Sequence, residues 1–441
     1  MTSARRLLLF VALPTAVLAA VLAGIVYAFN VRDEAPLDEA PFSTPSADLI
    51  ARGAYLARAG ICMGCHTATG GVAYAGGRGV PTPFGTVYAP NLTPELNTGI
   101  GAWSPAEFWR ALHNGRSRDG RLLYPAFPYP NYTRVTRADS DALHAYLHSL
   151  PATAQPNRPP ELRFPFDRQA ALAVWRARYF RPAKHASDAA RSSERPDLVH
   201  SAEWNRGAYL VEGLGHCNAC HASRNALGAT AGPLDLAGGL MPVQNWYAPS
   251  LTSPAEAGVA AWDTQHIVDL LKTGVAAPGG ARVAVAGPMS EVVSGGTQHL
   301  TDADLRAMAN YLKALPQSAE VRSVPQRGRI AAVNDAGAKL YEQHCAQCHG
   351  EQGEGAAGIY PALAGNRVVA MRTPANLVHL VIEGGFPPAT AGNPRPFGMP
   401  PFATVLSDDE VAQVLSFIRG SWGNGAEAVS RLEVSRYRSA R

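Results

Sequence analysis

The sequence is poor in charge. Only 17% of its 441 residues are Asp, Glu, Lys or Arg, against about a quarter in ordinary globular proteins. A formal net charge of +4, with no dense run of Lys or Arg, argues against nucleic-acid binding. Glycine and proline are abundant instead, at 42 and 35 residues, which indicates compact, loop-rich domains and excludes a coiled coil or a disordered chain. At about 100–200 residues per domain, the length allows two to four domains.

Sequence motifs of the common enzyme classes are also missing. The chain contains no nucleophile elbow, no phosphate-binding glycine loop and no His-Glu metal motif. Its motifs therefore indicate no substrate chemistry of its own. This absence is weak support for a non-catalytic role, because a bound cofactor can itself be catalytic.

A long uncharged run follows Arg5 and Arg6 near the N-terminus. It covers 7–29, and as a helix it is roughly 34 Å long, enough to cross a bilayer. A cleaved signal peptide is the alternative, because Ala-rich spots resembling cleavage sites lie around 17–23, although an uncleaved anchor fits the length better. In both cases the preceding arginines predict export of everything after residue 30. We expect 1–30 to be a membrane anchor or signal segment and 31–45 to be a polar linker.

The six cysteines fall in three pairs, and each pair is a Cys-X-X-Cys motif followed directly by His. The cysteines are Cys62, Cys65, Cys217, Cys220, Cys345 and Cys348, and the histidines are His66, His221 and His349. In c-type attachment the two thiols add to the haem vinyl groups, and the adjacent His is the proximal iron ligand. A thioredoxin-like redox pair requires no such His, and a zinc site would need further cysteines, of which none remain. The sequence therefore predicts three covalently bound haem c groups.

The surroundings of the three motifs repeat, which indicates that one module is used three times. The segment RGAYL at 52–56 recurs at 206–210, and YAP at 88–90 recurs at 247–249. Each unit closes on an amphipathic helix that starts with a Ser/Thr-X-X-Asp/Glu capping pattern. These starts are at Thr136, Thr301 and Ser407.

The repeats divide the chain. We expect domains at 46–182, 198–318 and 330–422, linkers at 183–197 and 319–329, and a solvated tail at 423–441. Residues 152–200 contain several prolines and are expected to form an irregular connector. The fold class that follows is all-α and loop-rich, with three tandem haem domains behind an N-terminal transmembrane helix.

A haem that only transfers electrons usually has a sixth iron ligand, and methionine in that position raises its potential. The loop before the closing helix should supply it, which makes Met289 and Met399 the candidates in the second and third units. In the first unit Phe127 stands at that place, and a phenyl ring cannot ligate iron. Another residue of this unit could ligate instead, or a partner could supply the ligand, or the iron is five-coordinate. The candidate ligands within the unit are His113, His144, His148 and Tyr129. We favour an open or weakly ligated first haem.

Together these motifs resemble the triple-haem cytochrome c subunit of membrane-bound dehydrogenases, built from class I cytochrome c domains. Such subunits serve periplasmic quinoprotein alcohol dehydrogenases and flavin gluconate and sorbitol dehydrogenases, and related chains accompany molybdenum hydroxylases. The resemblance covers nearly the whole mature chain and includes the segments 82–104, 123–129 and 419–424. It implies the three histidines as proximal ligands and Met289 and Met399 as distal ones. The distal Met of the first haem is missing, since the family has it where Phe127 stands here.

The resemblance also implies a function. The chain would pass electrons one at a time from a periplasmic dehydrogenase to membrane ubiquinone or to a terminal oxidase. Its partner would be a large catalytic subunit of the quinoprotein, flavoprotein or molybdenum type. The haem domains would lie on the periplasmic side of the bacterial cytoplasmic membrane. The alternative is a haem enzyme, peroxidase-like or another oxidoreductase, that works at an open first haem.

Overall fold

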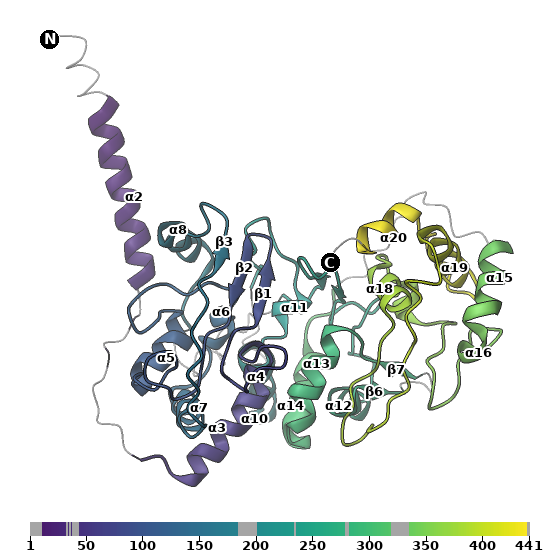
Figure 1. Cartoon of the computed structure of the whole chain (residues 1–441), viewed down its shortest axis with the longest axis horizontal. Coiled ribbons are helices and arrows are strands. Elements are labelled where there is room, and N and C mark those ends of the chain that lie inside the picture. Colours follow the sequence, from purple (N-terminus) through teal and green to yellow (C-terminus); the bar gives the residue numbers. More distant parts are fainter. Residues whose placement is uncertain are drawn as a thin grey trace.

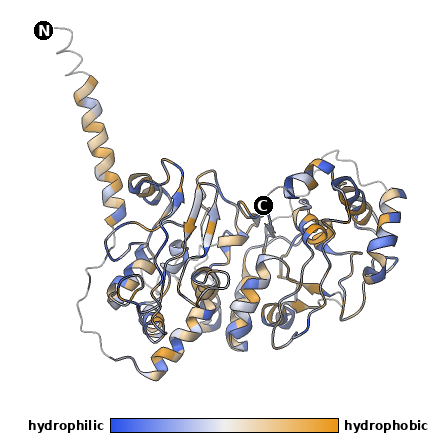
Figure 2. Ribbon diagram, in the orientation of Figure 1, coloured by the Kyte–Doolittle hydropathy of each residue, from blue (hydrophilic) through white to orange (hydrophobic). Residues whose placement is uncertain are grey.

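The computed structural model describes residues 11–31, 34, 37, 44–183, 201–232, 235–277, 282–318 and 335–438. Three domains lie in a row, and the helix α2 (Leu13–Val31) projects from the first of them (Figure 1). Within the described residues α2 alone is long and apolar enough to cross a membrane, and none of its most apolar stretch is buried. Most of its residues are hydrophobic (Figure 2). A signal sequence would show the same features, so the uncleaved anchor stays a prediction.

Each domain opens with a helix that leads into its Cys-X-X-Cys-His motif. These helices are α3 (Ala47–Ala59), α10 (Ala202–Ala208) with the π-helical turn η2 (Tyr209–Leu214), and α15 (Asp335–His344). The motifs themselves form the short turns α4 (Cys62–Cys65), α11 (Asn218–His221) and α16 (Ala346–His349). The stretch from RGAYL to the first cysteine is one residue longer in the second domain than in the first. The π-helical turn absorbs this extra residue, because it closes a wider ring than an α-helical turn does.

Each domain closes on a second long helix, as the sequence predicts. These helices are α7 (Arg137–His148), α14 (Asp302–Ala314) and α19 (Asp408–Gly420). Their predicted N-caps are confirmed, since the side chains of Thr136, Thr301 and Ser407 each accept a hydrogen bond from the backbone N–H three residues later. The cap at Ser407 is a full capping box with Glu410.

The glycine of the repeated RGAYL segment has a structural reason. In the first domain α3 crosses α7 with Gly53 directly against the backbone carbonyl of Ala142, and in the second domain Gly207 lies in the same way against Ala307. Any side chain at either glycine would collide with that backbone. The close crossing places the start of each motif firmly against its closing helix.

The remaining elements are shorter. The helices are α5 (Pro105–Asn114), α6 (Tyr129–Tyr132), α8 (Gln169–Tyr179), α12 (Thr264–Thr273), α13 (Pro288–Gly295), η4 (Thr297–His299), α17 (Arg367–Ala370), α18 (Ala375–Glu383) and α20 (Arg431–Arg438). The strands are β1 (Gly79–Thr82), β2 (Gly85–Tyr88), β3 (Glu161–Leu162), β4 (Gly239–Leu240), β5 (Tyr247–Ala248), β6 (Val275–Ala276) and β7 (Val283–Ala284). β1, β2 and β3 form one antiparallel sheet, and β4 pairs with β5 and β6 with β7. The expected all-α class is therefore only partly right, because short antiparallel strands accompany the helices.

Two segments expected to be irregular contain helices. The connector at 152–200 includes α8, which packs against α2. The tail beyond residue 422 includes α20, where Val434 is fully buried and Arg438 donates to Asp408. The prediction of a solvated tail is thus wrong for this part, and α20 belongs to the third domain.

The hydrophobic core has two parts. One cluster of buried side chains is shared by the first and second domains, and a separate cluster lies in the third domain. The predicted linkers at 31–45, 183–197 and 319–329 fall mostly outside the described residues, so these boundaries stay predictions.

Candidate haem sites

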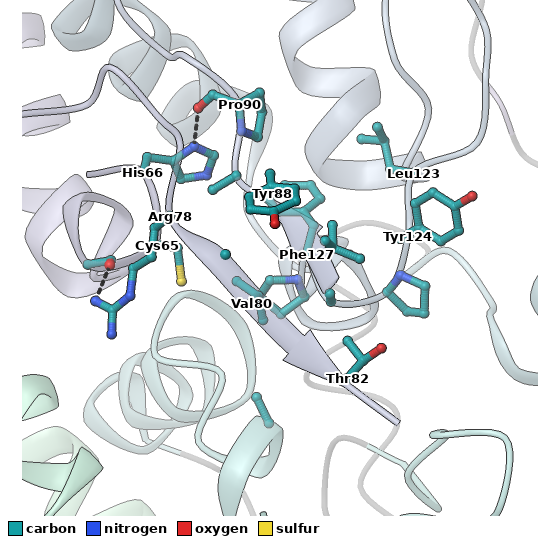
Figure 3. Close-up of a pocket in the computed structure, with 18 of the residues that line it drawn as sticks. Cys65, His66, Arg78, Val80, Thr82, Tyr88, Pro90, Leu123, Tyr124 and Phe127 are labelled. Carbon is teal, nitrogen blue, oxygen red and sulfur yellow. Dashed lines mark hydrogen bonds between the residues drawn. The ribbon is translucent and has the colours of Figure 1, made fainter. Parts of the chain in front are cut away.

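The three histidines of the motifs are held in the same way. Their Nδ1 atoms lie 2.8, 2.7 and 3.0 Å from the backbone carbonyl oxygens of Pro90, Pro249 and Pro361 (Figure 3 shows the first). A carbonyl can only accept, so Nδ1 donates and Nε2 keeps its lone pair. Burial lowers the pKa of each imidazole, against the opposing effect of the proline carbonyl, and keeps it neutral. Each ring is thus prepared as a ligand for a metal.

The cysteines are also free thiols, which thioether formation requires. None of the six is in a disulfide. Burial raises the pKa of the Cys62 and Cys217 thiols to about 12 and that of Cys345 to about 11. A redox pair or a thiolate metal site needs lowered values instead. Among the described residues no group of three or more His, Cys, Asp or Glu side chains is placed to hold a metal ion.

A cavity of about 1800 Å³ adjoins the first motif. Cys65, His66 and Phe127 all lie on its wall (Figure 3). Much of the remaining wall near the motif is apolar, as a porphyrin requires: Leu92, Ile100, Trp103, Phe108, Leu112, Leu143 and Leu147. The cavity continues to Cys220 of the second domain and to Phe386 of the third. The residues of the first domain thus fit a covalently held haem.

Phe127 lies on the wall of this cavity, and its place at the distal side of the first haem stays a prediction. Its ring packs against Tyr132 at 5.3 Å between centroids, and the Tyr132 hydroxyl donates to the carbonyl of Gly60. Neither ring is placed as a conventional iron ligand. Phe127 thus presents an apolar ring to the cavity.

The four other candidate ligands of the first domain do not line the cavity. The Nε2 atoms of His144 and His148 lie 3.0 and 3.1 Å from the backbone carbonyls of Trp103 and Ile100. The ring of His113 stacks on Trp109 at 4.1 Å, and Tyr129 is fully buried against Phe180 and Arg176. The structure thus brings none of them to the site.

The two candidate methionines are half-buried. Met289 is the second residue of α13 and packs against the core shared by the first two domains. Met399 packs against the third core, which Cys345 also contacts, and its backbone pairs with Gly385 in both directions. Their role as iron ligands stays a prediction.

Contacts between domains reach the sites. Arg78 donates to the carbonyl of Gly64 inside the first motif at 2.6 Å and pairs with Glu291 of α13 at 3.0 Å. Glu291 lies two residues after Met289. Arg78 therefore links the first motif to α13, the helix that carries the distal candidate of the second domain.

The proline carbonyls are functional groups that the sequence argument missed. Pro90 and Pro249 belong to the repeated YAP segment, which carried no assigned role. Pro361 follows the third motif more closely, twelve residues after its histidine. The sequence signal that could have indicated these carbonyls is a proline that follows a tyrosine or an alanine downstream of each motif.

Comparison with known proteins places these sites in a family. A family model described as cytochrome c matches residues 50–151, 205–316 and 335–422. The chain is 39% identical over 416 residues to the cytochrome c subunit of alcohol dehydrogenase (quinone) from Gluconacetobacter polyoxogenes, covering 90% of this chain and 86% of that one. It is 38% identical over 395 residues to the gluconate 2-dehydrogenase cytochrome c subunit of Pantoea cypripedii, covering 86% and 87%. It is 33% identical over 440 residues to the fructose dehydrogenase cytochrome subunit of Gluconobacter japonicus, covering 93% and 86%.

Proposed function

The chain belongs to the cytochrome c family, and from this premise we propose that it is the electron-transfer subunit of a membrane-bound dehydrogenase complex. One observation carries the proposal: three Cys-X-X-Cys-His motifs, each with its His Nδ1 fixed on a proline carbonyl. We assign three covalently bound haem c groups to them. His66, His221 and His349 are the proximal ligands, and Met289 and Met399 are the distal ligands of the second and third haems.

The chemistry of the bound haem is the uptake and release of one electron at its iron. The chain's own residues orient the group and set its surroundings. The hydrogen bond to the proline carbonyl fixes the ring of each histidine, and this outer contact also makes the ligand nitrogen more basic. Apolar side chains around the first motif exclude water, and a distal methionine raises the reduction potential.

The relatives suggest who the partners are. Each is named as a cytochrome subunit of a dehydrogenase, and one of those enzymes is named for quinone. We assign to this chain a large catalytic dehydrogenase subunit as electron donor, and ubiquinone or a terminal oxidase as acceptor. The helix α2 would hold the haem domains at the periplasmic face of the bacterial cytoplasmic membrane.

A direct test starts from the full chain in phospholipid vesicles. We expect three haems per chain by pyridine haemochromogen assay, and two when Cys62 and Cys65 are both replaced by Ala. After reduction with dithionite and removal of the excess, decylubiquinone should reoxidise the haems. Fewer than three haems would contradict the assignment of the sites. If the haems stay reduced with decylubiquinone but are reoxidised by a purified terminal oxidase, the electron acceptor is the oxidase and not ubiquinone.

A second candidate function rests on Phe127. Because Phe127 lines the cavity and none of His113, His144, His148 and Tyr129 does, we place an open iron in this domain. We expect carbon monoxide to bind one haem per chain, and Phe127→Met to abolish that binding. Peroxide turnover by the isolated chain, lost in the same variant, would favour a haem enzyme. Carbon monoxide binding without turnover would favour the relay.

A further inference from the structure

The helix α8 is fixed at the end of α2 that faces the first domain (Figure 1). Asn30, in the last turn of α2, donates to the backbone carbonyl of Ala173 at 2.9 Å and accepts from the buried guanidinium of Arg176 at 2.9 Å. The guanidinium of Arg181 lies over the Phe29 ring at 4.6 Å. Specific hydrogen bonds and a cation–π contact therefore fix the position of α8 relative to α2.

Large apolar side chains around α8 are exposed. Phe164, just before the helix, is 77% exposed, Val174 on the helix is 57% exposed, and Leu227 is 45% exposed. Trp175, which is half-buried, adjoins Leu227, since its indole N–H donates to the carbonyl of Leu227 in a loop of the second domain at 2.9 Å. We call these four residues, with the arginines described next, the α8 surface. Exposed apolar groups gathered in this way mark an interaction site more often than a free surface.

The α8 surface is also basic. Residues 158–181 contain six arginines and two carboxylates, so this segment alone has the net charge of the whole chain, +4. Arg176 is buried, and Arg158 and Arg168 pair with the two carboxylates. The others are Arg163, Arg178 and Arg181, which are exposed and have no carboxylate partner among the described residues. The charge of this surface therefore favours the binding of anionic groups.

We propose that the α8 surface binds the anionic phospholipid headgroups of the membrane that α2 enters. The inference rests on the proposed role of α2 as an anchor. Tryptophan and arginine beside the end of a membrane span are typical of the headgroup region, where the ring enters the interface and the guanidinium meets phosphate. The basic charge adds attraction to an anionic surface, and a second attachment of this kind fixes the orientation that a single helix leaves free.

The orientation matters for the first haem site. Val174, Trp175 and Arg178 also lie on the wall of the cavity that contains Cys65 and His66. Docking of the α8 surface would therefore hold the wall of that cavity against the bilayer. A lipid-soluble electron acceptor would then reach it without crossing bulk water.

Hydrogen exchange on the haem-loaded full chain tests the proposal. The chain is reconstituted into nanodiscs of phosphatidylcholine, with or without a third of phosphatidylglycerol, and exchange of the backbone amides is followed by mass spectrometry. We expect amides of α8 to exchange roughly tenfold more slowly in the anionic discs. Arg178→Glu and Val174→Asp, both at exposed positions, should each remove most of this protection. Arg306→Glu is the matched control, an exposed arginine on α14, far from α2 (Figure 1).

The outcomes separate the two proposals. A chain that fails to remain with the discs contradicts the anchor and so the proposed function. A chain that remains, but whose α8 exchanges equally fast in both lipid compositions, overturns the docking surface alone. Protection of α8 by an added catalytic dehydrogenase subunit, and not by anionic lipid, would also overturn it, because the surface would then be a protein interface.

Discussion

The contacts between the first two domains are reciprocal, whereas those between the second and the third are not. The Tyr55 hydroxyl of the first domain donates to Asp304 of the second, and Tyr209 of the second donates to Asp139 of the first, both at 2.5 Å. Each aspartate is also paired with an arginine of its own domain, Arg52 or Arg206. The shared hydrophobic cluster lies beside this exchange.

The third domain lacks the residues that this exchange needs. When the opening helices are aligned on their buried glycine, Ala336 and Lys339 stand in place of the arginine and the tyrosine. The boundary with the second domain is made otherwise. Asn376 exchanges two hydrogen bonds of 2.8 Å with the backbone of Tyr247, and Trp246 stacks on His379 at 4.8 Å. The third domain therefore lacks the arginine and the tyrosine through which the first two domains make their reciprocal contacts.

The largest expected effect comes from the helix crossing. Gly207→Val forces a side chain into the carbonyl of Ala307, and we expect a loss of about 4 kcal/mol in the free energy of unfolding. Because the first two domains share a core, both should unfold earlier and together, while the third keeps its own transition. Calorimetry with haem absorbance measures this. Gly232→Val is the control, since no heavy atom lies within 4 Å of its added Cβ. Separate transitions of the first and second domains would contradict the shared core.

Lowering the pH should destabilise the first two domains through a group that the third domain lacks. Burial, with a smaller effect of the neighbouring His148, lowers the pKa of His144 from 6.5 to about 4. The folded state therefore holds a neutral ring, and its stabilisation is complete above pH 6.5 and lost as the pH falls towards 4. The loss amounts to about 3 kcal/mol. Leu415 stands at the equivalent position of the third domain.

The matched variant is His144→Leu. Denaturant unfolding between pH 7 and pH 4 should show a shallower pH dependence of the first transition in this variant than in the parent chain, with the third domain's transition unchanged. Equal slopes in the parent and the variant would assign the acid sensitivity to other groups.

The reciprocal tyrosines should each matter less. Although burial acts to raise the pKa of Asp304, hydrogen bonds from Arg206 and Tyr55 hold that pKa below its ordinary value. Tyr55→Phe removes one of these bonds to a charged group, and we expect a loss of about 2 kcal/mol in the shared transition. Tyr209→Phe should behave alike. The control is Tyr437→Phe, whose hydroxyl contacts Thr373 inside the third domain and should affect only the third transition. Unequal effects of the two tyrosines would refute the reciprocity.

The boundary with the third domain should give the smallest effect. Asn376→Ala removes both hydrogen bonds to Tyr247. We expect the coupling between the second and third domains to weaken by about 1 kcal/mol, with little change in either domain's own stability. Differential calorimetry of the variant should show the third transition moving away from the first. A loss as large as that of Gly207→Val would mean that the third domain is held as tightly as the pair.

Much of the arrangement could be predicted from local sequence. The capping patterns at Thr136, Thr301 and Ser407 define helix starts within a few residues, and the motif histidines follow their cysteines directly. The reciprocal contacts could not be predicted, because Tyr55 and Asp304 are 249 residues apart and nothing local marks them as partners. The α20 helix was missed for another reason. Only Val434 and Tyr437 of its eight residues are buried, so its apolar signal is weak amid three arginines.

The exchange between Tyr55–Asp304 and Tyr209–Asp139 has the form of an isologous contact, in which the same patch serves both sides about a two-fold axis. Such a contact is self-complementary, and two separate copies of a chain can make it without a peptide link. We therefore expect the first two domains to stay together through these contacts once they have folded. Among the described residues the third domain makes no such reciprocal contact and meets the second through Asn376 and His379 instead. We expect a protease cut between the first two domains to leave a nicked but intact pair, whereas after a cut before the third domain only its own contacts with the second would hold it.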